Sequence, residues 1–464
     1  MNPITIPNIT IPVIGLPTIG IPSVGFPSAS GGGFAWPAGL KESIKAIYDP
    51  AKQGMTNYDV IEAYVEDFTN WNYVKARGTV TVSQHKFIIT ECILNGLGIV
   101  EDTQEPYSNL TVRITGITDN QGVLITDYVN GQHQIINTIT EDGIYTIEDR
   151  HHFIGFGCNF VGTCNITIEQ LPTSILKDLS GNGNHAYLYG GKGKLNSGMG
   201  VYQEDFTAWK TYNRADVDIT PNILHITKVG TSNAVFISNT FLNNRNIYKL
   251  DIKGITNQSL YIGNYASANS LIKITQDGLY EIDSTKFPDS DIYGIGFIDF
   301  IGDCDITITQ IPDYPNLLCY DGKMYAVCYG FPILEDYTVM ADRTWFDTST
   351  NNKTFISKRN TDNSVAAFLF EKVNGVTQQT TASFGESNSV EFAQGISYQS
   401  KNSYNGIAIK SGNTTDIDTL VIGGSILNNN FSELWQGCHG KIIIADRSFT
   451  EGEITWLKDN WKKI

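Results

Sequence analysis

The sequence predicts an all-β protein of more than one domain. Glycine, tyrosine and phenylalanine are abundant, with 44, 23 and 22 copies in 464 residues, a composition typical of strands joined by turns. Asp-Gly pairs at Asp142–Gly143 and Asp277–Gly278 supply turns between alternating segments. The stretches around these two pairs belong to a block that occurs twice in the same order. A chain of this length is expected to hold two to four domains.

The first 39 residues contain a proline-punctuated apolar segment, NITIPVIGLPTIGIPSVGFP at 8–27. Its prolines exclude a helix, and its odd five-residue unit places apolar side chains on both sides of an extended chain. There is no charged residue before Lys41, so a thread enclosed by partner protein is favoured over a disordered tail. Neither a secretion signal nor a membrane span fits. The predicted anchor is 4–27, with the side chains Ile9, Ile11, Ile14, Leu16, Ile19, Ile21, Val24 and Phe26.

An internal duplication defines two further modules. EDFTNW at 66–71 returns as EDFTAW at 204–209, and IGFGCNFVGTCNITIEQLP at 154–172 returns as YGIGFIDFIGDCDITITQIP at 293–312. Within CNITIEQL, alternation puts Ile166, Ile168 and Gln170 on one side of a strand. Residues 66–172 and 204–312 are therefore predicted to be two copies of a small β-sandwich.

Two segments outside the copies point to a third fold. DLSGNGNHAYLYG lies within 173–203, and GCHGKIIIADRSFTEGEITWLKDNW spans 437–461. They resemble the opening turn and the last strand with closing helix of concanavalin A-like, or laminin-G-like, jelly rolls. The helix is predicted independently, because Thr450 and Glu453 form a capping box and Ile454, Leu457 and Trp461 share one helical face.

The segment IKAIYDPAKQGMTNYDV, together with EDYTVMADRTW at 335–345 and ASFGESNSVEF at 382–392, is similar to proteins from tailed phages of gut Bacteroides-type hosts, including the crAss-like group. This resemblance implies a discontinuous jelly roll assembled from 40–65, 173–203 and 313–464, into which the two modules are inserted. The alternative is three consecutive sandwiches, with 40–65 and 173–203 as linkers.

The sequence supplies no catalytic constellation. It holds no G-x-S-x-G, no phosphate loop and no paired carboxylates at glycosidase spacing; the acidic turn around Asp299, Asp303 and Asp305 is interpreted as a solvated loop. His151 and His152 are adjacent, so in a strand their rings diverge, and we predict no metal site there. No catalytic residue and no cofactor are predicted.

One loop could hold calcium. Laminin-G-like domains can bind that ion through loop oxygens, and Asp178, Asn182 and Asn184 are the nearest candidates. The favoured interpretation is that these residues and their glycines simply permit a tight turn.

The seven cysteines show no metal-ligand spacing. Local disulfides between Cys158 and Cys164, or between Cys319 and Cys328, are conceivable. Buried reduced thiols in a protein assembled in a cytosol are the favoured expectation.

Together these features predict a phage virion fibre, on the head or the tail, that is made in the host cytoplasm. It would be a homotrimer held to capsid or tail proteins through residues 4–27, and its lectin-like sandwiches would bind host-surface glycans. A net charge of −16 argues against a nucleic-acid partner, and no membrane insertion is expected. The alternatives are a capsule-degrading glycosidase or lyase on the same scaffold, and a purely architectural fibre.

Overall fold

The structure is a computed structural model. It describes residues 35–55, 68–70, 72–73, 78–83, 85–93, 96–100, 110–129, 132–147, 154–190, 206, 210–211, 215–220, 223–230, 234–239, 247–264, 270–283, 293–298, 300–311, 314, 317–346, 352–359, 366–374, 377–381, 387–390, 395–410, 418–427 and 430–464. The predicted anchor residues 9–26 lie outside this described part of the chain.

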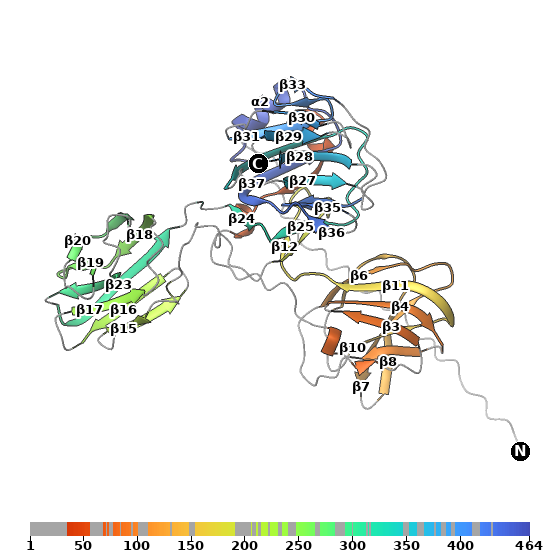
Figure 1. The fold of residues 1–464 in the computed structure, drawn as a ribbon, viewed down its shortest axis with the longest axis horizontal. Helices are drawn as coiled ribbons and strands as arrows, with labels where there is room; N and C mark the ends of the chain where they lie inside the picture. Colours follow the sequence, from red (N-terminus) through yellow and green to blue (C-terminus); the bar gives the residue numbers. More distant parts are fainter. Residues whose placement is uncertain are drawn as a thin grey trace, which may run out of the picture.

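The protein is nearly all β, as predicted, and Figure 1 shows its strands gathered in three lobes. The described α-helices are α1 (Leu40–Ser43) and α2 (Glu451–Asp459), and short 3-10 turns occupy Ala51–Gln53 and Phe68–Asn70. No described helix has the length and apolar character needed to cross a membrane.

The largest lobe consists of two main sheets. The strands of the first sheet are β1 (Ile44–Tyr48), β37 (Gln436–Ala445), β26 (Thr338–Trp345), β31 (Ile396–Ser400), β32 (Ser403–Tyr404) and β33 (Ile407–Ala408), with β24 (Leu318–Asp321) also paired to β37. Those of the second are β12 (Ile175–Leu176), β13 (Ala186–Tyr189), β25 (Tyr325–Cys328), β34 (Leu420–Ile422), β27 (Lys353–Arg359), β28 (Ala366–Asn374), β29 (Thr377–Thr381) and β30 (Ser387–Ser389). A separate hairpin joins β35 (Ser425–Leu427) to β36 (Asn430–Ser432).

This lobe is discontinuous in sequence. Strand β1, which precedes the first module, pairs antiparallel with β37 near the C-terminus. Strand β13, which lies between the modules, pairs with β25, which follows the second. The arrangement confirms the discontinuous jelly roll and excludes the alternative in which 40–65 and 173–203 are linkers.

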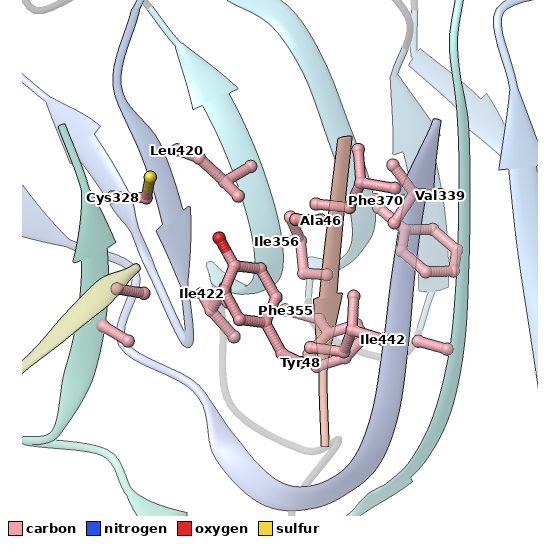
Figure 2. Close-up of a cluster of buried hydrophobic side chains, with 14 of the residues drawn as sticks. Ala46, Tyr48, Cys328, Val339, Phe355, Ile356, Phe370, Leu420, Ile422 and Ile442 are labelled. Atoms are coloured by element: carbon pink, nitrogen blue, oxygen red, sulfur yellow. The ribbon is translucent and has the colours of Figure 1, made fainter. Parts of the chain in front are cut away.

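The core between the two sheets explains why distant segments assemble. Figure 2 shows Ala46 and Tyr48 from β1 among side chains of the C-terminal strands, including Phe355 and Ile442. All four are fully buried. Because burial of apolar surface is the main driving force, removing β1 would leave this core open on one side.

The inserted modules are two copies of one sandwich, each with two five-stranded sheets. The first copy contains β2 (Asn72–Tyr73), β5 (Gly96–Val100), β10 (Ile154–Cys158), β7 (Val123–Val129) and β8 (Gln132–Ile139), facing β3 (Gly78–Ser83), β4 (Lys86–Cys92), β11 (Gly162–Gln170), β6 (Leu110–Thr115) and β9 (Gly143–Ile147). The second copy contains β14 (Lys210–Thr211), β17 (Ala234–Asn239), β22 (Tyr293–Ile298), β19 (Leu260–Asn264) and β20 (Ser270–Ile274), facing β15 (Ala215–Thr220), β16 (Ile223–Val229), β23 (Gly302–Ile311), β18 (Ile247–Lys253) and β21 (Gly278–Asp283).

The duplication extends to single positions. Strands β4 and β16 have the same sequence of buried and exposed side chains, and β11 repeats in β23. Ile166, Ile168 and Gln170 share one side of β11, as predicted, and all three are buried. Gly116 and Gly254 both have a φ of +90°, and a Cβ at either would lie about 2 Å from a backbone oxygen of the neighbouring strand. Only glycine fits this close approach.

The closing helix α2 forms as predicted. The Thr450 side chain accepts a hydrogen bond from the Glu453 amide, and the Glu453 carboxylate accepts one from the Thr450 amide at 2.9 Å. Ile454 and Leu457 are buried, as is Trp461 just beyond the helix end, and they pack beside Ile443 of β37.

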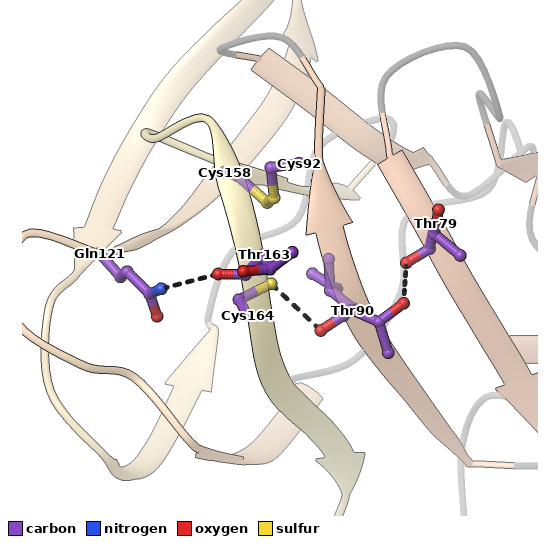
Figure 3. The surroundings of a disulfide bond; sticks show 8 residues. Thr79, Thr90, Cys92, Gln121, Cys158, Thr163 and Cys164 are labelled. Carbon is purple, nitrogen blue, oxygen red and sulfur yellow. Dashed lines mark hydrogen bonds between the residues drawn. A yellow bond between two sulfur atoms is a disulfide. The ribbon is translucent and has the colours of Figure 1, made fainter.

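The cysteine expectations need correction, because the favoured expectation of reduced thiols is wrong for Cys92 and Cys158. Cys158 forms a disulfide with Cys92, not with Cys164 (Figure 3). The disulfide connects β4 in one sheet of the first module to β10 in the other sheet. It therefore links two sheets, whereas the expected Cys158–Cys164 bond would have closed a local turn. Cys164 is a free thiol that donates a hydrogen bond to the Ile89 carbonyl at 3.2 Å. Neither Cys319 nor Cys328 belongs to a disulfide in the structure, so the second conceivable local bond is not formed either.

Candidate functional site

The candidate site lies where the first module meets the jelly roll. Strand β11 ends the module at Gln170, and β12 of the jelly roll starts at Ile175, so only four residues separate the two. Leu171 in this link is 1% exposed and packs in a cluster with Tyr187, Tyr189 and Val327 of the jelly roll. The short link, buried at Leu171 and Pro172, holds this edge of the module against the second jelly-roll sheet. We call this contact region the joint.

An aromatic group from three jelly-roll strands covers the joint. Tyr189 of β13 stacks on Tyr325 of β25 with ring centroids 5.3 Å apart, and Tyr325 stacks on Phe431 of β36 at 4.3 Å. The hydroxyls of Tyr189 and Tyr329 are 2.9 Å apart and form a hydrogen bond. Tyr325, Tyr329 and Phe431 are each only partly buried, so each of these residues keeps some surface in contact with solvent.

The first module contributes two charged side chains to the same place. The guanidinium carbon of Arg113, on β6, lies 4.3 Å from the centroid of the Tyr329 ring. Arg113 is registered opposite Glu169 of β11, and their charged atoms are 3.8 Å apart. The joint thus combines aromatic ring faces with a cation and an anion, on elements that are remote in sequence.

Burial shifts the pKa values of the acidic side chains in the joint. It raises the pKa of the Glu169 carboxyl, against the opposing effects of Arg113 and Lys86. Burial, followed by the negative charge of Glu169, raises the pKa of Tyr325 to about 12, and the same two causes raise the pKa of Tyr329. Both tyrosines are therefore neutral hydrogen-bonding groups near pH 7.

Such a site suits a neutral or weakly charged polyhydroxylated ligand. Flat ring faces can pack against the C–H faces of a sugar, and the arginine, the carboxylate and the tyrosine hydroxyls can exchange hydrogen bonds with its hydroxyl groups. Ligand sites also occur preferentially at domain interfaces.

The loop predicted as a calcium candidate has a structural role. The Asp178 carboxylate accepts hydrogen bonds from the amides of Ile47, Ser180 and Asn184 and from the Ser180 hydroxyl, at 2.8–3.1 Å. The Asn182 and Asn184 side-chain amides donate to β1 carbonyls at 2.8 Å. The structure therefore brings all three predicted residues together, but it uses them to hold β1.

Other candidates from the sequence are scattered. The loop interpretation is wrong for Asp303 and Asp305, which are exposed residues of strand β23, because alternation along this strand turns them outward. Asp305 Oδ1 lies 2.7 Å from His225 Nε2. Asp299 and the pair His151–His152 fall outside the described residues. Within the described part of the chain, no three His, Cys, Asp or Glu side chains are grouped as a metal site would need.

A second polar cluster lies inside the jelly roll. Glu371 is fully buried and accepts hydrogen bonds from Arg343 at 2.5 Å, and from Ser397 and Tyr404 at 2.8 Å. Each partner comes from a different strand of the facing sheet. Because the carboxylate is saturated and sealed from solvent, the arrangement cross-links the sheets and offers no ligand site.

Sequence reasoning missed the residues of the joint. Alternation places Arg113 and Glu169 on the outer face of the module, which is where any solvated charge would lie. Tyr325, Tyr329 and Phe431 carry no local signal in the sequence. Only the packing of the module on the jelly roll brings these side chains together.

No family model and no curated protein matches this chain. Among solved structures it is similar to Trypanosoma rangeli sialidase in complex with the inhibitor DANA, with 9% identity, a TM-score of 0.23, and coverage of 82% of this chain and 83% of that one. The same enzyme in complex with sialic acid gives 8% identity, a TM-score of 0.25 and 83% coverage of each chain. Scores this low carry no argument about fold or chemistry.

Proposed function

We propose that this protein is a structural fibre protein of a phage virion and that it attaches to host-surface polysaccharide through the joint. The observation that supports binding is the partly exposed aromatic group of Tyr325, Tyr329 and Phe431 beside Arg113 and Glu169. The resemblance of the sequence to phage proteins supports the virion setting, and the apolar segment at 4–27 supports anchoring in capsid or tail proteins.

Binding without cleavage is the favoured chemistry. Glycosidases of most families flank the scissile bond with two carboxyl groups. In the described part of the joint, Glu169 is the one carboxylate whose charge acts on the clustered tyrosines. One acid can orient a sugar, but a second group would be needed to activate water or to attack the anomeric carbon.

The direct test is to titrate purified capsule polysaccharides into the full chain and to follow both binding and chain length. The proposal predicts saturable binding with no shortening of the polysaccharide over hours. Shortened chains would replace it with the glycosidase or lyase alternative. Absence of binding across a broad panel would favour a purely architectural fibre.

Anchoring has a separate test. Deleting residues 1–30 should abolish incorporation into virions and leave polysaccharide binding by the purified protein unchanged, because the described sandwiches lie after this segment. Normal incorporation of the deleted protein would contradict the anchoring role.

A further inference from the structure

Two buried cysteines face each other across neighbouring strands of the jelly roll. Cys319 on β24 is registered directly opposite Cys438 on the antiparallel strand β37. The flanking residues Leu318 and Tyr320 point into the main core, so alternation turns Cys319 to the other face of the sheet. Cys438 lies on that same face, and both thiols sit under Tyr314, Leu317 and Phe346.

The geometry meets the requirement for a covalent bond. Residues directly opposite on antiparallel strands have Cα atoms about 4.5–5.5 Å apart, inside the range that disulfides span. The two side chains already touch: a hydrogen bond with Cys438 and burial together raise the pKa of the Cys319 thiol. Cys319 is 7% exposed and Cys438 is fully buried.

We propose that Cys319 and Cys438 form a second disulfide when the protein meets an oxidising medium, with a low-molecular-weight disulfide such as glutathione disulfide as oxidant. The Cys319 thiolate attacks one sulfur of glutathione disulfide and releases one glutathione. The Cys438 thiolate then attacks Sγ of Cys319 in the mixed disulfide and releases the second. Two protons leave the pair, and two electrons reduce one glutathione disulfide to two glutathiones.

The bond would have a defined mechanical effect. Strand β24 is the first jelly-roll strand after the second module, and β37 is a long strand that also pairs with β1 and β26. A disulfide between them would bond the segment that follows the inserted module covalently to a strand that three others pair with. In the chain-entropy account, a cross-link over so long a loop restricts the unfolded state strongly.

The test uses the full chain with Cys304→Ser, because trypsin leaves Cys304 and Cys319 in one peptide, 287–323. The protein is equilibrated with oxidised and reduced glutathione, free thiols are blocked under denaturing conditions, and the tryptic digest is analysed by mass spectrometry. The expected product is peptide 287–323 linked to peptide 411–441, lighter by two hydrogen atoms than the sum of the two. Oxidation should also raise the unfolding temperature by about 5 °C or more.

Two controls keep the result decisive. The protein is first reduced, so the return of the Cys92–Cys158 link in the same digest shows that oxidation has occurred. Cys328 is buried and has no cysteine opposite it on its paired strands, so it should be recovered alkylated. Cys438→Ser should lose both the linked peptide and the oxidation-dependent rise in unfolding temperature. Recovery of alkylated Cys319 and Cys438 from a sample in which Cys92–Cys158 is linked would overturn the proposal, and this result needs no variant other than Cys304→Ser.

Discussion

The guanidinium group of Arg113 lies over the ring of Tyr329 at 4.3 Å and so joins the first inserted module to the jelly roll. The two residues belong to parts of the chain that share no sheet. Arg113 also faces Glu169, which places a cation between a carboxylate and an aromatic ring. Arg113 and Glu169 form the polar part of the joint. Its apolar part is the packing of Leu171 against Tyr187 and Tyr189.

We expect Arg113 and Tyr329 to be energetically coupled. Replacing Arg113 with Ala, Tyr329 with Leu, and both together should give a coupling free energy of about 1 kcal/mol in a double-mutant cycle from urea unfolding, since cation–π pairs at partly exposed sites are of that size. The control is the pair of Lys273 and Tyr261 in the second module, at 5.6 Å and remote from the joint. Strictly additive losses at Arg113 and Tyr329 would show that the contact contributes nothing to the joint.

Reduction of the Cys92–Cys158 disulfide should destabilise the first module selectively. In the second module, the positions paired in the same way hold Val229 and Phe297, which pack in its apolar core. Losing a native cross-link typically costs about 2–5 kcal/mol. Hydrogen exchange should therefore speed up in β4 after reduction and stay constant in β16. Equal acceleration in both strands would contradict this account.

The stability of the jelly roll should fall in mild acid because of His439. Burial lowers the pKa of His439 to about 4, against an ordinary value of 6.5. Between about pH 6.5 and pH 4 the His439 imidazole is protonated in the unfolded chain and neutral in the folded chain. The free energy of unfolding should therefore drop by about 1 kcal/mol per pH unit over this range. His439→Gln should lower the overall stability but flatten this pH dependence of the free energy of unfolding. The control His225→Gln, on the exposed face of the second module, should leave the pH dependence unchanged. An unchanged slope in His439→Gln would refute the assignment.

Asp178 is expected to act without calcium. Its carboxylate already accepts four hydrogen bonds, two of them at 2.8 Å from the Ser180 amide and hydroxyl. Asp178→Ala should therefore cost about 2–3 kcal/mol, because it leaves buried donors unpaired. Treatment of the wild-type protein with a chelator should leave the unfolding temperature unchanged. A rise of several degrees on adding calcium would instead restore the ion-binding interpretation.

Much of the fold was predictable because its signals are local or repeated. Alternation in CNITIEQL places Ile166 and Ile168 inward, the duplicated blocks mark the insertions, and Thr450 with Glu453 marks the helix start. The disulfide partner was not predictable, since Cys92 is far from Cys158 in sequence and meets it only when two sheets stack. The joint was hidden for the same reason: nothing in the sequence indicates which outward face of a module docks.

The measurement that tests the central claim most directly is the affinity for host capsule polysaccharide of three proteins: wild type, Tyr325→Ala, and the control Tyr261→Ala in the second module. Tyr325 stacks on Phe431 in the joint, so its removal should weaken binding by about tenfold or more, the effect of losing one aromatic contact and disordering its neighbour. Tyr261→Ala should bind like wild type. Equal affinity of Tyr325→Ala and wild type, with both proteins folded, would contradict glycan binding at the joint.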